Sequence, residues 1–152
     1  MSKLSVLQEY KNPIFIARHS EGEVHKISDK YVVKVPVYGN NEYKNLMYHE
    51  INIARLLFSL GFPVPEPITI DYVNVRGEIE LGYIMEYIEG ISIYDKNISI
   101  EDRVVAKNLL HRETKKLFKK GFTSKIGAVE CILTPNEEIR LIDFSSFTYK
   151  DL

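Results

Sequence analysis

The chain has 152 residues, of which 45% are apolar, and its formal net charge is -1 at pH 7. This length supports one domain with a sizeable core and is too short for two well-formed ones, and the balanced charge excludes an overall attraction to nucleic acid or to a membrane surface. The one cysteine, Cys131, cannot form an internal disulfide, and no apolar run is long enough for a signal peptide or a membrane span, so we expect a reduced, cytoplasmic protein.

The first half of the sequence predicts strands around one helix. Apolar alternation from Ile14 to Val37 is typical of consecutive antiparallel strands. From Glu42 the apolar spacing becomes helical, and this helix is expected to end at Gly61, because Pro63 and Pro65 prevent its continuation. Two further strands are expected, Ile68 to Val73 and Leu81 to Ile88, joined at Arg76-Gly77.

The second half predicts one long helix and a hairpin. The helix is expected from about Glu101 to Lys120, where Gly121 ends it. A turn at Thr134-Pro135-Asn136 then separates two short strands, Cys131 to Leu133 and Ile139 to Ile142.

Two charged residues stand where apolar ones are expected. Lys34 lies inside a strongly apolar strand, and Glu50 shares a helical face with Ile53 and Ala54. An unpaired buried charge is very costly, so each of these residues needs a partner or a route to solvent at the rim of the sheet. We expect the two side chains to form an ion pair, an arrangement that can orient the ammonium towards phosphate oxygens.

Five segments in the expected order resemble the protein-kinase-like superfamily, especially small atypical members such as RIO kinases and aminoglycoside-phosphotransferase-like enzymes. The resemblance covers about residues 14 to 147. The matching segments are Val32-Val33-Lys34, the helix around Glu50, the link Gly61-Phe62-Pro63-Val64-Pro65, Met85-Glu86-Tyr87-Ile88-Glu89-Gly90, and Ile139-Arg140-Leu141-Ile142-Asp143-Phe144-Ser145.

This resemblance implies an α+β, bilobal fold with a small antiparallel sheet and one helix in its N-terminal lobe. The lobe would cover about residues 1–85, followed by a hinge at 86–90 and a minimal C-terminal lobe at 91–152. It also implies weak binding of ATP and Mg²⁺. The implied nucleotide-binding residues are Gly22, Val32, Lys34, Glu50, Met85, Glu86, Tyr87, Ile88 and Asp143. Asp143 is also the implied metal ligand.

The sequence departs from the family pattern where phosphoryl transfer is carried out. Of the glycine-rich loop that covers the phosphates, only Gly22 remains. The catalytic aspartate position holds Ile126, the second metal-ligand position holds Cys131, and the preceding histidine position holds Ser124. Isoleucine cannot accept a proton, and a thiol is a poor ligand for magnesium. We therefore expect a pseudokinase with a regulatory or partner-binding role.

Two alternatives remain open. A slow atypical ATP-dependent phosphotransferase is one, because electrostatics and positioning dominate phosphoryl transfer, and Glu130 could replace the missing base. The other is a non-enzymatic interaction module that uses the basic helix 101–125. This segment contains eight lysines and arginines against three acidic residues. The default interpretation of such a helix is a solvated surface, and RNA binding is the more specific hypothesis.

Overall fold

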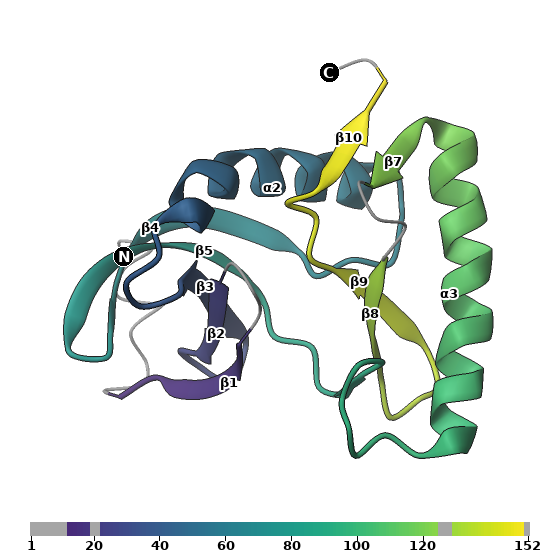
Figure 1. Cartoon of the computed structure of the whole chain (residues 1–152), viewed down its shortest axis with the longest axis horizontal. Helices are drawn as coiled ribbons and strands as arrows, with labels where there is room; N and C mark the ends of the chain where they lie inside the picture. The colour runs from purple at the N-terminus through teal and green to yellow at the C-terminus, as the bar shows by residue number, and fades with distance from the viewer. Residues whose placement is uncertain (1–11, 19–21, 125–128, 151–152) are drawn as a thin grey trace. The chain divides into compact units, whose positions relative to one another are not determined.

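The computed structural model describes residues 12–18, 22–124 and 129–150. Its backbone divides into two compact units: the described parts of Met1–Ile51 with Glu66–Tyr87, and those of Asn52–Pro65 with Ile88–Leu152. The described residues form two helices and antiparallel strands (Figure 1), as the sequence predicts for a mixed α and β protein. Neither of these two helices has the apolar length that crossing a bilayer requires.

The first unit contains a five-stranded antiparallel sheet with the order β1-β2-β3-β5-β4. Its strands are β1 (Ile14–Arg18), β2 (Gly22–Lys26), β3 (Tyr31–Pro36), β4 (Pro67–Val75) and β5 (Glu78–Glu86). The predicted connection between β4 and β5 at Arg76-Gly77 is confirmed. Both residues have positive φ angles, 57° and 73°, as a two-residue hairpin turn of the favoured twist requires.

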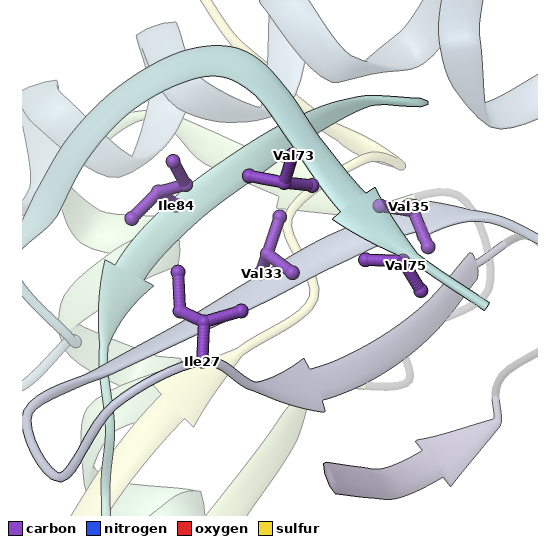
Figure 2. Close-up of a cluster of buried hydrophobic side chains, with 6 residues drawn as sticks. All are labelled: Ile27, Val33, Val35, Val73, Val75 and Ile84. Atoms are coloured by element: carbon purple, nitrogen blue, oxygen red, sulfur yellow. The ribbon is translucent and has the colours of Figure 1, made fainter. Parts of the chain in front are cut away.

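One face of this sheet carries a compact apolar cluster (Figure 2), made of Ile27, Val33, Val35, Val73, Val75 and Ile84. A Cβ atom added at Gly82 would overlap Val33 and contact Val35, so the absent side chain of this glycine lets the strands curl tightly. Successive strand residues alternate between faces, and Lys34 therefore projects from the face opposite to Val33 and Val35.

Arg76, in the turn between β4 and β5, is at the centre of a polar network. Arg76 pairs with Glu23 on β2 and with Glu80 on β5, the latter at 2.7 Å between Nη2 and Oε2. The Glu23 carboxylate also accepts a hydrogen bond from His25 at 3.2 Å. Strand β3 separates β2 from β5, so the Arg76–Glu23 contact spans a neighbouring strand. It indicates that the sheet is strongly curled.

Helix α2 (Glu42–Ser59) follows this unit's first three strands. The Asn40 side chain accepts a hydrogen bond from the Glu42 amide at 2.9 Å and so fixes where the helix begins. At the other end, Gly61 has a φ of 85°, and the amides of Gly61 and Phe62 donate to the carbonyls of Phe58 and Leu57. This Schellman motif confirms the predicted end of the helix at Gly61.

In the second unit, helix α3 (Ile100–Lys120) runs beside a three-stranded sheet of order β6-β8-β9 (Figure 1). The strands of this sheet are β6 (Ile91–Ser92), β8 (Glu130–Leu133) and β9 (Ile139–Ile142). Ser99 caps the start of α3 and Gly121 its end, as the sequence predicts for the glycine. The predicted hairpin of β8 and β9 is confirmed.

Two strand pairs in this unit are not predicted by the sequence, and the first of them joins β6 to β8. Strand β7 (Phe122–Ser124) pairs with β10 (Phe147–Tyr149) in a separate two-stranded sheet. Phe122 is buried there against the rings of Phe62 and Tyr149. The short segment after α2 is held in place by a 2.7 Å hydrogen bond from the Leu141 amide to the Pro63 carbonyl.

Candidate functional site

The predicted ion pair between Lys34 and Glu50 is confirmed. The Lys34 Nζ atom lies 3.1 Å from Oε1 and 3.4 Å from Oε2 of Glu50. Lys34 is 3% exposed and Glu50 is 1% exposed, so both charges are withdrawn from water. A pair this deeply buried is held in one geometry, because the low local dielectric strengthens the attraction and solvent cannot compete for it.

The sequence places these two groups by simple means. In β3, Lys34 lies opposite Val24 of β2 and Tyr83 of β5, and both registers direct its side chain away from the apolar cluster. Glu50 follows the start of α2 by about two turns, on the helical face that buries Met47 and Ile51. The pair therefore joins the central strand of the sheet to α2.

Gly22 lies directly beside the stem of Lys34. It pairs with Pro36 across the β2–β3 ladder. A Cβ atom added at Gly22 would lie 3.1 Å from two methylene carbons of Lys34 and 3.0 Å from the Val35 carbonyl oxygen. The missing side chain thus makes room for the lysine, which is a local reason for glycine at this position. Residues 19–21 of the preceding loop lie outside the described residues.

Tyr43 is a third member of this site, and the sequence analysis did not find it. Its hydroxyl donates a hydrogen bond to Glu50 Oε1, and its ring centroid lies 4.6 Å from Lys34 Nζ. The residue is fully buried. A tyrosine in the first turn of a helix looks in the sequence like an ordinary core residue, so no signal marked it.

The predicted hinge residues leave the sheet at the end of β5. Met85 pairs with Val32, which is buried and projects from the same face as Lys34. The amides of Glu86 and Tyr87 donate to the carbonyls of Glu66 and Lys30, at 3.0 and 2.8 Å. Those contacts fix the path of the backbone as far as Tyr87, and Ile88 is the next residue along the chain.

Asp143 follows directly after β9, with a φ of 63° in the left-handed region that aspartate adopts more readily than most residues. Glu130 is half-buried at the start of β8, opposite Ile142. Cys131 is fully buried. Burial raises the pKa of the Cys131 thiol to about 11, and the charge of Glu130 acts in the same direction. A thiol that stays protonated at neutral pH is neither a magnesium ligand nor a nucleophile.

The described residues are suited to only one mode of magnesium binding, in which the protein supplies few ligands. Among the described residues, no group of three or more histidine, cysteine or acidic side chains could enclose a metal. Mg²⁺ commonly binds through one or two carboxylates, with substrate phosphates and water completing its shell. Asp143 is suited to that mode. Ile126, which the sequence analysis places at the catalytic aspartate position, and the neighbouring Lys125 lie outside the described residues.

The basic helix is exposed along its length. Each of the seven lysines and arginines of α3 is exposed, and only Ala106 and Leu117 of this helix are buried. Lys116 pairs with Glu113 at 3.2 Å on the surface. Phe118, in the same part of the helix, is 49% exposed.

No protein-family model matches the sequence, and no curated protein matches it. Among solved structures, the chain is similar to the Rio2 kinase of Chaetomium thermophilum, determined as a complex with ADP, Mg²⁺ and phosphoaspartate. The superposition covers 97% of this chain and 52% of the kinase chain, with a TM-score of 0.62 and 14% sequence identity. The chain therefore spans about half the length of that kinase, and the likeness shows a protein-kinase-like fold.

Proposed function

We propose that this protein binds an adenine nucleotide with Mg²⁺ and acts as a pseudokinase, regulating a partner rather than transferring phosphate. The observation that carries this proposal is the buried Lys34–Glu50 pair at the centre of a protein-kinase-like fold. Replacing a buried ion pair by well-packed hydrophobic residues is often neutral or stabilising, so a functional requirement for charge is a reason for the pair to be present.

Each site residue has one role in this proposal. Lys34 contacts the phosphates, Glu50 holds Lys34, and Gly22 keeps the strand close to the lysine stem. Val32 and the segment from Met85 to Ile88 contact the adenine. The segment does so through backbone groups other than the Glu86 and Tyr87 amides, which donate to Glu66 and Lys30. Asp143 would hold the magnesium ion. When bound, the ion would offset the negative charge of the phosphates.

Phosphoryl transfer is expected to be absent or very slow. Ile126 lacks the carboxylate that orients an acceptor hydroxyl, and Cys131 is a buried, protonated thiol where a second metal ligand is expected. These changes affect separate contributions to the barrier, namely positioning and electrostatic stabilisation. The single change Ile126→Asp is therefore not expected to restore activity.

Nucleotide binding is tested by titrating ATP with and without Mg²⁺ and following the melting temperature. Saturation at about 100 times the dissociation constant stabilises a protein by about 2.7 kcal/mol, so millimolar ligand detects even weak binding. Lys34→Ala should abolish the shift, and Lys30→Ala, which removes an exposed lysine from the β2–β3 turn, should not. No shift in the folded wild type would contradict the proposal. ATP turnover that disappears in Asp143→Ala would replace it with a slow phosphotransferase.

A second candidate function is RNA binding through α3, and the exposed charges of this helix favour it. The helix extends over about 32 Å, and in its C-terminal half the exposed Arg112, Lys115, Lys116 and Lys119 have the i, i+3, i+4 and i+7 spacing of residues on one face. Such a row can track a phosphate backbone, and the exposed ring of Phe118 can stack on a base.

This second function is tested by RNA-binding assays with a single-stranded oligonucleotide at several salt concentrations. The double change Lys115→Glu with Lys119→Glu should abolish binding, and Phe118→Ala should weaken it. Lys30→Glu with Lys44→Glu carries the same charge change on exposed residues of the first unit and serves as the control. Equal loss in both double variants would show only a nonspecific charge effect.

A further inference from the structure

The phenol of Tyr43 contacts both members of the buried ion pair. Tyr43 lies in the first turn of α2, seven residues before Glu50, and both side chains are buried. The Tyr43 hydroxyl and the Lys34 ammonium donate to the same oxygen, Glu50 Oε1. The Tyr43 ring also lies against the ammonium, 4.6 Å from its centroid to Nζ.

This arrangement restricts the Glu50 carboxylate more than the ion pair alone can. A carboxylate with a single cationic partner can rotate about its terminal bond and exchange its two oxygens. A second donor, held by the helix itself, fixes which oxygen faces Lys34. The ring adds a cation–π attraction that limits where the ammonium can move, and this attraction is strong because the group is withdrawn from water.

We propose that Tyr43 is a positioning residue that sets the orientation of the Lys34 ammonium and, through it, the affinity for nucleotide phosphates. This rests on the nucleotide binding proposed above. Tyr43 acts through Glu50 and Lys34 without contacting the nucleotide. Its effect should therefore depend on the phosphates of the ligand and not on the adenine.

The test compares ATP with adenosine, which has the same base and no phosphates. Tyr43→Phe keeps the ring and removes the hydrogen bond, and it should weaken ATP binding about tenfold, as expected for loss of one hydrogen bond to a charged group. Adenosine binding should be unchanged. Tyr48→Phe is the matched control, because Tyr48 lies on the same helix and is exposed. Unchanged ATP affinity in Tyr43→Phe, or an equal loss for both ligands, would overturn the inference.

A second measurement separates this inference from the proposed function. Without nucleotide, the acylation rate of Lys34 by acetic anhydride is compared with that of exposed Lys30 by peptide mass spectrometry. Tyr43→Phe should raise the Lys34 rate relative to Lys30, and Tyr43→Leu should raise it further because the ring is also lost. If the Lys34 rate rises in these variants but the wild-type protein binds no ATP, nucleotide binding is refuted and the positioning role is retained. An unchanged ratio would refute the positioning role even if ATP binds.

Discussion

Removing one member of the buried ion pair should destabilise the protein strongly. Lys34 and Glu50 are 3% and 1% exposed, so neither charge can recover its hydration in the folded state. Removing one partner of such a pair typically costs about 3–5 kcal/mol, because the other charge loses its counterion and remains desolvated. Glu50→Leu should therefore lower the free energy of unfolding by about 4 kcal/mol, which corresponds to a melting temperature about 8–16 °C lower in a chain of this size.

Replacing the whole network should restore most of that loss. In Lys34→Met with Glu50→Leu, both charges of the ion pair are removed, but the Tyr43 hydroxyl loses Glu50 as an acceptor. Adding Tyr43→Phe removes this group as well, and the triple variant should be within about 1 kcal/mol of the wild type. Urea denaturation followed by circular dichroism measures all three variants. The reasoning is refuted if Glu50→Leu costs less than about 1 kcal/mol, as an exposed pair would, or if the triple variant is no more stable than Glu50→Leu.

Three further predictions concern single residues. Burial acts to raise the pKa of Glu23, but the hydrogen bond from His25 and the charges of Arg76 and His25 lower it below its ordinary 4.5. The ionised Glu23 carboxylate therefore stabilises the fold above about pH 4.5, and this stabilisation is lost as the pH falls further. Glu23→Gln should be less stable than the wild type near neutral pH. In acid denaturation profiles, the difference between the two should become smaller at low pH. Cys131 should react with a thiol reagent at pH 8 only after unfolding, and rapid reaction of the native protein would contradict its burial. Gly82→Ala should cost about 1–3 kcal/mol in urea denaturation, because its methyl group would overlap Val33, and wild-type stability would show that the sheet can relax.

The ion pair was predictable because both residues break an otherwise apolar pattern. Lys34 interrupts a run of valines, and Glu50 stands on the buried face of a helix. Turn and cap residues were equally informative, since Arg76-Gly77 and Gly121 occupy positive-φ positions that terminate their elements. At these turns and caps, local chemistry alone decides the structure.

Contacts between distant segments could not be predicted in the same way. The Arg76–Glu23 pair depends on the curl of the whole sheet, and the pairing of β7 with β10 joins two three-residue segments of ordinary composition. Tyr43 was missed for a different reason. Its aromatic ring fits the core pattern of α2, and nothing in the sequence marks that its hydroxyl reaches Glu50 two turns further along the same helix.

Two sets of residues in this chain differ from what their positions lead one to expect, in opposite ways. In the first unit, Lys34 and Glu50 are charges at buried positions, where well-packed apolar side chains are often at least as stabilising, and such local conflicts are expected at functional sites. At the positions that resemble the phosphoryl-transfer loop, Ile126 and Cys131 are apolar or neutral where charge and hydrogen bonding are needed for chemistry. If Lys34 contacts phosphate as we propose, the contrast between the two sets of positions favours binding of a nucleotide without phosphoryl transfer.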